Sequence, residues 1–268
     1  MSTPVQTSRQ TALITGASSG IGLDFARQFA EGGYDVVLVA RGQQKLEELA
    51  TELSGKHGVK ALALPADLAD PAAPARLMER LKAEGLQVDV LINNAGFASY
   101  GAFAQTSLEE ESRMIAVNIT ALTALTKAVL PGMLERRQGR ILNVASTAAF
   151  QPGPLMAVYY ATKAYVLSFS EALAEETRGS GVTVTCLCPG PTQTGFQARA
   201  KMEESKLVKG KDIMDSATVA RAGYEALHRG QAVAIPGVMN KLLAQSVRLM
   251  PRSVVARVVH QMQERVQA

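Results

Sequence analysis

Short apolar runs alternate with longer segments of helical periodicity along most of this chain. Seven runs have the length of strands and carry apolar side chains at successive positions, over residues 11–16, 35–41, 60–66, 88–94, 140–146, 182–188 and 231–236. Helical periodicity fills the intervals, over residues 20–32, 43–57, 71–84, 107–137, 155–180 and 216–229. Strands that are apolar on both faces and separated by helices are typical of a parallel sheet covered on both sides. The pattern therefore predicts a doubly wound α/β fold, in which helices cover both faces of a seven-stranded parallel sheet.

Two segments depart from this alternation. Residues 191–215 form a long connection after the sixth predicted strand, and a connection of this length in a compact domain is usually a lid or a binding element. Residues 238–268 follow the seventh strand, and their apolar positions recur at steps of three or four, as in a helix that Pro251 should interrupt. We therefore expect a flexible N-terminus over residues 1–10, one catalytic domain over residues 11–237, and a helical extension of the same domain over residues 238–268.

Composition excludes several classes of protein. The chain has 268 residues, 47% of them hydrophobic, which is long enough and apolar enough for a folded domain. Two cysteines are too few for a disulfide framework, no apolar run reaches the roughly eighteen residues of a membrane-spanning helix, and the first ten residues lack an apolar signal segment. We therefore expect a cytoplasmic protein. The three histidines lack the spacing of metal ligands, so no metal site is expected.

The net charge of +4 belongs to the C-terminal segment. Residues 1–236 hold equal numbers of acidic and basic residues, whereas residues 237–268 hold five basic residues and one acidic residue. Nucleic-acid binding favours a broad basic face with aromatic platforms, but Trp is absent and aromatic residues make up 5% of the chain, so we expect no nucleic-acid partner. The segment is either a helix that packs on the domain or on another subunit, which we favour, or a peripheral membrane helix.

A glycine-rich turn joins the first predicted strand to the first predicted helix. In the stretch Gly16-Ala17-Ser18-Ser19-Gly20-Ile21-Gly22, the glycines allow a tight turn and a close approach of the backbone to a pyrophosphate, while the start of the helix offers free N–H groups. Taken alone, such a stretch is also compatible with an ordinary tight turn. Its position directly after the first strand favours a dinucleotide-binding site, as in Rossmann folds.

The end of the second predicted strand bears on the choice of cofactor. A cofactor without a 2′-phosphate is usually held by an acidic residue at this place, but Ala40 is neutral and Arg41 carries a guanidinium that suits a phosphate. These two residues favour NADP over NAD. In the alternative, Arg41 is only a solvated charge at the end of a strand. We expect Lys45, on the next helix, to lie at the surface.

Four polar residues farther along form a candidate catalytic set. Tyr159 and Lys163 lie four residues apart in a predicted helix and so share a face, where an ammonium would lower the pKa of the phenol and let it exchange a proton with an alcohol oxygen. Ser146 ends the fifth strand, at the edge of the sheet where ligands bind. Asn118 is an amide within an apolar helical stretch. Each also has a structural explanation when taken singly: a helical pair, a turn residue and a satisfied core amide.

Together these motifs resemble the classical branch of the short-chain dehydrogenase/reductase family. Thr15 with the glycines at 16, 20 and 22 matches the family's T-G-x-x-x-G-x-G, and residues 93–96 match its N-N-A-G. The four candidate catalytic residues match its tetrad. Further matches are the segment that contacts the nicotinamide, at Pro189-Gly190, Thr192 and Thr194, and the pair beside the adenine, at Asp67-Leu68. The resemblance covers residues 11–237, with the motifs in the family's order.

The resemblance implies a role for each residue of the tetrad. Tyr159 would be the general acid/base, Lys163 would lower its pKa and hold the nicotinamide ribose, Ser146 would position the substrate carbonyl, and Asn118 would hold a water of the proton relay. Gly42 departs from the pattern, because similar NADP-preferring members often carry a polar residue there. The implied site for NADP(H) consists of Gly16, Ser18, Ser19, Gly20, Ile21, Gly22, Arg41, Asp67, Leu68, Asn94, Ala95, Gly96, Tyr159, Lys163, Pro189, Gly190, Thr192 and Thr194.

The substrate pocket is expected to be apolar. The segments after the fourth, fifth and sixth strands supply its candidate residues, chiefly Phe97, Phe150, Met156 and Phe196, beside Tyr100, Leu155, Pro191 and Met202. Such a lining favours a mostly apolar ketone or aldehyde, reduced to an alcohol with NADPH. The alternatives are oxidation of a secondary alcohol, of the hydroxysteroid or 3-hydroxyacyl kind, and a nucleotide-sensing protein without catalysis. By resemblance, the protein is also expected to form a homo-oligomer, either a dimer or a tetramer.

Overall fold

A seven-stranded parallel sheet forms the centre of the computed structural model, which describes residues 9–196, 200 and 213–264. The strands lie in the order β3-β2-β1-β4-β5-β6-β9, and each neighbouring pair is parallel. Their bounds are β1 Thr11–Thr15, β2 Asp35–Ala40, β3 Ala61–Pro65, β4 Val90–Asn93, β5 Gly139–Val144, β6 Val182–Leu187 and β9 Val233–Ala234. The predicted seven-stranded sheet is therefore confirmed.

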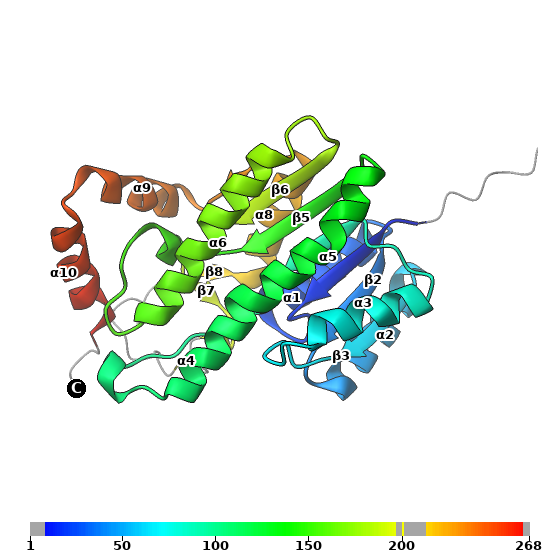
Figure 1. Ribbon diagram of the computed structural model, residues 1–268, viewed down its shortest axis with the longest axis horizontal. Helices are drawn as coiled ribbons and strands as arrows, with labels where there is room; N and C mark the ends of the chain where they lie inside the picture. Colours follow the sequence, from blue (N-terminus) through cyan, green and yellow to red (C-terminus); the bar gives the residue numbers. More distant parts are fainter. Residues whose placement is uncertain (1–8, 197–199, 201–212, 265–268) are drawn as a thin grey trace, which may run out of the picture.

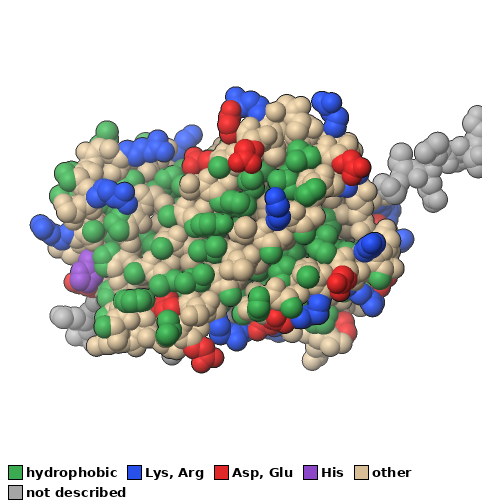
Figure 2. Space-filling view, in the orientation of Figure 1, with side chains coloured by type: hydrophobic (Ala, Val, Ile, Leu, Met, Phe, Trp, Pro, Cys, Tyr) green, Lys and Arg blue, Asp and Glu red, His purple; other side chains and the backbone are tan. Residues whose placement is uncertain are grey.

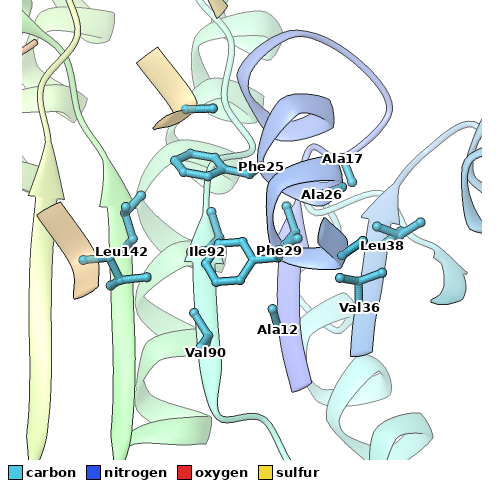
Figure 3. Close-up of a cluster of buried hydrophobic side chains, with 14 of the residues drawn as sticks. Ala12, Ala17, Phe25, Ala26, Phe29, Val36, Leu38, Val90, Ile92 and Leu142 are labelled. Carbon is cyan, nitrogen blue, oxygen red and sulfur yellow. The ribbon is translucent and has the colours of Figure 1, made fainter. Parts of the chain in front are cut away.

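Alternate side chains of the central strands point to opposite faces of the sheet. Ala12 of β1 packs on one face, in a cluster that Phe25 and Phe29 of the first helix complete (Figure 3). Leu13 of β1 and Val37 of β2 pack in the cluster on the other face. Because both faces are covered, successive positions of a strand must both be apolar, which explains the continuous apolar runs in the sequence.

Helices form a layer on each face of the sheet (Figure 1). One of them, α8, begins after Asp215, whose carboxylate accepts a hydrogen bond from the backbone N–H of Thr218 at 2.8 Å and so caps the helix. One layer consists of α1 Gly20–Glu31, α2 Gln43–His57 and α8 Ser216–His228. The other consists of α3 Ala73–Ala83, α5 Leu122–Glu135 and α6 Ala157–Glu176. The doubly wound architecture is thereby confirmed.

The helix predicted over residues 107–137 is one continuous helical run in three pieces. These are α4 Leu108–Ile115, a π-helical turn Ala116–Ala121, and α5. Its most apolar 18-residue stretch has a mean hydropathy of 1.5, and it is the one helix in the described chain that is long and apolar enough to cross a membrane. Met114, Leu125 and Val129 of this run are buried, the last two against the sheet. Packing on the sheet accounts for part of its apolar character, since 39% of that stretch is buried.

The segment after the sixth strand is not entirely a loop. β7 Thr192–Gln193 pairs in parallel with β8 Met214–Asp215, so its two ends lie side by side. Residues 197–199 and 201–212 fall outside the described part of the chain, and with them Met202 of the predicted pocket. The last predicted strand is shorter than expected, because β9 lies at the edge of the sheet and Pro236 follows it.

The C-terminal extension folds as two helices on either side of Pro251. α9 covers Val238–Ser246, a 3₁₀ turn covers Val247–Leu249 and α10 covers Arg252–Gln263, so the interruption predicted at Pro251 is confirmed. Val255 and Val259 of α10 are buried in the apolar cluster that also contains Tyr159. One side of the extension therefore packs on the domain, as the favoured alternative predicts.

We expect Val259→Asp to release α10 from the domain, because a carboxylate at a site only 6% exposed would lose its hydration. Val258→Asp, at a neighbouring site that is 41% exposed, is the matched control. Hydrogen exchange of the α10 amides and the midpoint of thermal unfolding measure the effect, which should be roughly 2–4 kcal/mol for Val259→Asp alone. Equal exchange in the two variants would contradict the docking of α10.

Candidate active site

The glycine-rich turn closes tightly against the segment that follows β4. Gly16 has a φ of +68°, and a Cβ at this position would lie 2.7 Å from Nδ2 of Asn94. A Cβ at Gly22 would lie 2.2 Å from the carbonyl oxygen of Gly16. Side chains are therefore excluded at both positions, and the backbone stays open to a ligand. The free N–H groups at the start of α1, behind the extended Ser19, provide a binding site for an anion.

Thr15, at the end of β1, fastens this turn to the end of β4. Its hydroxyl accepts hydrogen bonds from the backbone N–H groups of Asn94 and Ala95, both at 3.0 Å, and donates to the carbonyl of Ile92 at 3.2 Å. The side chain of Asn94 donates in turn to the carbonyl of Thr15 at 2.9 Å. The glycine-rich turn and the N-N-A-G segment thus form one continuous wall of a cavity.

Arg41 and Lys45 line the same cavity beyond the end of β2. Asp67 also lines this end, where its carboxylate accepts hydrogen bonds from the backbone N–H of Ala69 at 3.0 Å and from Arg113 of α4 at 2.9 Å. These hydrogen bonds and the neighbouring cations hold the pKa of Asp67 below its usual value. Lys45, in the first turn of α2, is exposed at the surface, as expected, and also lines the cavity.

Asn118 lies in the π-helical turn between α4 and α5. Its Nδ2 donates to the carbonyl of Phe97 at 3.0 Å and to Oγ1 of Thr162 at 3.1 Å, while its Oδ1 accepts from the backbone N–H of Phe97 at 3.2 Å. The amide is buried and ties together α6 and the segment after β4 from behind the cavity wall. Its described contacts are those of a satisfied core amide, and a role in holding water stays a prediction.

Tyr159, Lys163 and Ser146 meet at the cavity. Nζ of Lys163 donates to the carbonyl of Val144 at 2.8 Å and lies 5.7 Å from the centroid of the Tyr159 ring. The Ser146 hydroxyl accepts from the backbone N–H of Ala148 at 3.1 Å, which caps the 3₁₀ turn Thr147–Phe150, and donates to a carbonyl at 3.3 Å. Ser146 therefore serves as a cap and also presents a hydroxyl beside the phenol.

Burial is the main cause of the pKa shifts of Tyr159 and Lys163. Loss of hydration raises the pKa of Tyr159 well above its ordinary value, and hydrogen bonding to Ser146 opposes this only in part. The same loss lowers the pKa of Lys163 to about 8. The pKa of Tyr159 is thus raised overall, and a lowering of it by Lys163 stays a prediction. At neutral pH Tyr159 is a protonated phenol, able to donate a proton.

A cavity of about 560 Å³ is lined by the glycine-rich turn and by Arg41, Lys45, Asp67, Ser146, Tyr159 and Lys163. Every predicted cofactor residue lines it except Gly22, which lies behind the turn. Phe97, Met156 and Phe196 of the predicted substrate pocket line it as well. Phe150 does not belong with them: the 3₁₀ turn that contains it directs its side chain to a separate apolar cluster beside β6. In the described chain, no three His, Cys, Asp or Glu side chains come together as metal ligands would.

The residues of the cavity wall that the sequence analysis did not predict include Tyr160 and Gln263. Nε2 of Gln263 donates to the Tyr160 hydroxyl at 2.6 Å, and the Tyr100 hydroxyl donates to the backbone carbonyl of Gln263 at 2.6 Å. Contact of α10 with α6 brings them together across about a hundred residues of sequence. The sequence feature that could have indicated the buried position of Gln263 is its four-residue spacing from Val255 and Val259, which places it on the apolar face of the same helix.

A family model described as short chain dehydrogenase matches residues 10–205. The chain belongs to this family. The resemblance drawn from the motifs is thereby confirmed, and with it the assignment to oxidoreductases of the Rossmann-type fold. The matched range contains β1 to β6 of the central sheet, as well as β7, and includes the four candidate catalytic residues.

Two solved structures are similar over nearly the whole chain. A short-chain dehydrogenase from Sphingobium yanoikuyae in complex with NADPH is 38% identical, with a TM-score of 0.79, and the match covers 90% of this chain and 95% of that one. A bulky-bulky ketone specific alcohol dehydrogenase from Comamonas testosteroni is 32% identical, with a TM-score of 0.77, and the match covers 91% and 93%.

Named relatives in sequence include two kinds of acyl reductase. A ketoacyl reductase from Nostoc sp. is 35% identical over 219 residues, which are 81% of this chain and 75% of that protein. A very-long-chain 3-oxoacyl-CoA reductase from Pyrenophora tritici-repentis is 37% identical over 227 residues, which are 82% of this chain. The match spans 65% of the latter protein, so this chain covers somewhat less than two thirds of it.

We expect Lys163→Met to stabilise the protein at pH 7 while abolishing activity. Below pH 8 the folded state must hold a buried ammonium, and folding pushes the pKa of Lys163 from 10.5 down to about 8. Between these values the unfolded chain binds the proton that the folded chain has lost, so the stability of the native protein rises with pH. The variant should gain about 2–3 kcal/mol at pH 7, and the gain should vanish towards pH 10.5.

The matched control is Lys127→Met, at an exposed position of α5, which should change stability by less than about 0.5 kcal/mol. Denaturant unfolding at a series of pH values measures both variants. A Lys163→Met protein less stable than the native one at pH 7 would show that burial of the ammonium is not the dominant effect.

Proposed function

We propose that this protein reduces the carbonyl of a bulky, mostly apolar ketone or aldehyde to an alcohol with NADPH. The observation that carries the proposal is the position of a buried, protonated phenol, Tyr159, in a cavity that has a nucleotide cradle on one side and apolar side chains on the other. Carbonyl reduction needs a proton donor at neutral pH, and a phenol that stays protonated at that pH has a proton to donate.

The residues of the cavity fit NADP(H). The glycine-rich turn leaves room for a pyrophosphate where Cβ atoms would collide, and Arg41 and Lys45 line the cavity where the neutral Ala40 replaces an acidic ribose-binding residue. When bound, the nicotinamide supplies the hydride. The NADPH complex of the Sphingobium yanoikuyae relative supports the same choice of cofactor.

The protein's own part in the reaction is to place the carbonyl and move a proton. Tyr159 donates its phenolic proton to the carbonyl oxygen, and the Ser146 hydroxyl turns from its long 3.3 Å bond to Pro189 and donates to the same oxygen. Lys163, protonated below pH 8, stabilises the phenolate that the transfer leaves. The reverse sequence oxidises an alcohol.

The remaining cavity wall favours a large apolar substrate. Phe97, Val117, Met156, Tyr160 and Phe196 line it with apolar surface. The ketone specificity named for the Comamonas testosteroni relative supports this substrate class. The ketoacyl and 3-oxoacyl-CoA reductase relatives favour a second candidate, a 3-oxoacyl thioester, which a panel of bulky ketones and acyl thioesters would distinguish. We further propose a cytoplasmic homo-oligomer, as the sequence suggests.

We expect Tyr159→Phe to lower kcat by roughly 10²–10⁴-fold with NADPH and a bulky aryl ketone, because the proton donor is lost. Binding of NADPH, measured by fluorescence titration, should persist. Tyr165→Phe, on the outer side of the same helix, is the matched control and should retain full activity. Retained turnover in Tyr159→Phe would refute the assignment, and NADPH binding without turnover of any ketone or thioester by the native protein would favour a nucleotide sensor.

Arg41→Ala should lower kcat/KM for NADPH by roughly 10–100-fold, because a charge-assisted hydrogen bond to the 2′-phosphate is lost. The value for NADH should stay within about twofold, since that cofactor offers no phosphate for the guanidinium to bind. Initial rates with both cofactors at a saturating concentration of one ketone measure the ratio. Equal losses with NADPH and NADH would place Arg41 in a structural role instead.

A further inference from the structure

Most of the large hydrophobic side chains exposed in the described chain lie on the C-terminal extension. They gather at one end of the molecule, on α9, the 3₁₀ turn that follows it, and α10 (Figure 1). The most exposed are Leu249, at 88%, and Val238, at 78%. The full set, which we call the C-terminal surface, is Val238, Met239, Leu242, Leu243, Leu249, Met250, Val254, Val258 and Met262.

These side chains are exposed although both helices are docked on the domain. Ala244 of α9 is buried, and Val255 and Val259 of α10 are buried in the cluster beside the cavity. A helix that packs on a soluble domain needs one apolar stripe. α10 has that stripe and a further set of apolar residues directed outward, whereas α9 buries only Ala244. Packing within the described chain therefore explains only part of their apolar character.

Every charged side chain within the C-terminal surface is basic. Lys241, Arg248, Arg252 and Arg257 are exposed among its apolar residues, and no acidic residue occurs between Glu225 and Glu264. Figure 2 shows basic and hydrophobic side chains interspersed at the end of the molecule where α9 and α10 lie. The whole positive excess of the protein is concentrated here, since residues 1–236 carry no net charge.

We propose that the C-terminal surface binds a membrane that contains anionic lipids. Apolar side chains on an amphipathic helix enter the boundary between head groups and acyl chains, while surrounding Lys and Arg side chains attract anionic head groups. A second copy of the chain fits less well, because a two-fold interface would bring the cations of both copies together. The rest of the molecule has no net negative charge to attract this surface.

This location also places lipid beside the catalytic cavity. α10 carries the outward residues Val254, Val258 and Met262, and its last residue, Gln263, lines the cavity through its hydrogen bond to Tyr160. A protein that takes apolar substrates gains from contact with the phase in which they dissolve. The binding proposal rests on the exposed residues alone and does not depend on the proposed reaction.

Co-sedimentation of the full chain with lipid vesicles tests the proposal. We expect binding to phosphatidylcholine vesicles that contain about 30% phosphatidylserine, little binding to phosphatidylcholine alone, and weaker binding as salt is raised. Lys241→Gln with Arg248→Gln should weaken binding by at least roughly tenfold, since each cation near an anionic surface is worth about fivefold. Leu242→Ser with Leu249→Ser should weaken it as well, through lost apolar contact.

Controls with equal exposure lie elsewhere on the molecule. Leu108→Ser, at a site 79% exposed on α4, and Lys82→Gln, at an exposed site of α3, should bind vesicles like the native protein. The midpoint of thermal unfolding without vesicles establishes that all variants fold. Absence of binding to anionic vesicles, or equal binding by the surface variants and the controls, would overturn the proposal. So would sedimentation-velocity runs in which Leu242→Ser with Leu249→Ser splits a native dimer, because the surface would then be a subunit interface.

Discussion

The hydroxyl of Thr15 connects the end of β1 to the end of β4, and the rest of the site depends on this connection. The strand order β3-β2-β1-β4-β5-β6-β9 changes direction between β1 and β4, so the segments leaving these strands run to opposite faces and open a crevice at their carboxyl ends. Thr15 spans this crevice at its base, with two backbone N–H groups bound at 3.0 Å. The glycine-rich turn and the segment after β4 are thereby fixed relative to each other, and each later element of the site is built on that base.

The chemistry of the site follows from burial more than from pairing of charges. Tyr159 and Lys163 share a helix face, but the protein encloses both, and desolvation drives their pKa values in opposite directions, up for the phenol and down for the ammonium. Both shifts favour the neutral forms. The phenol therefore stays protonated at neutral pH, and burial of the ammonium has a cost in stability that the surrounding core must offset.

α10 links the interior of the protein with its surface. Its inner side contributes Val255 and Val259 to the cluster beside the cavity and ends in Gln263, while its outer side presents apolar and basic residues to the surroundings. A helix with two apolar sides is unusual for an element at the edge of a soluble domain. The extension is therefore part of the active site and of the exposed surface at once.

The sequence by itself determined the fold class and the cofactor cradle. Apolar runs that are buried on both faces have few alternatives to a parallel sheet. The glycines at 16 and 22 are required by the geometry of the turn itself, because Gly16 has a positive φ and a Cβ at Gly22 would collide with the carbonyl oxygen of Gly16. Local patterns also sufficed for the break at Pro251. They failed for Phe150, because its direction depends on how one 3₁₀ turn lies against the sheet. Only the tertiary structure decided that Gln263 meets Tyr160, because that contact joins two helices far apart in the sequence. It also decided that burial raises the pKa of Tyr159, because that shift depends on how completely the folded chain excludes water.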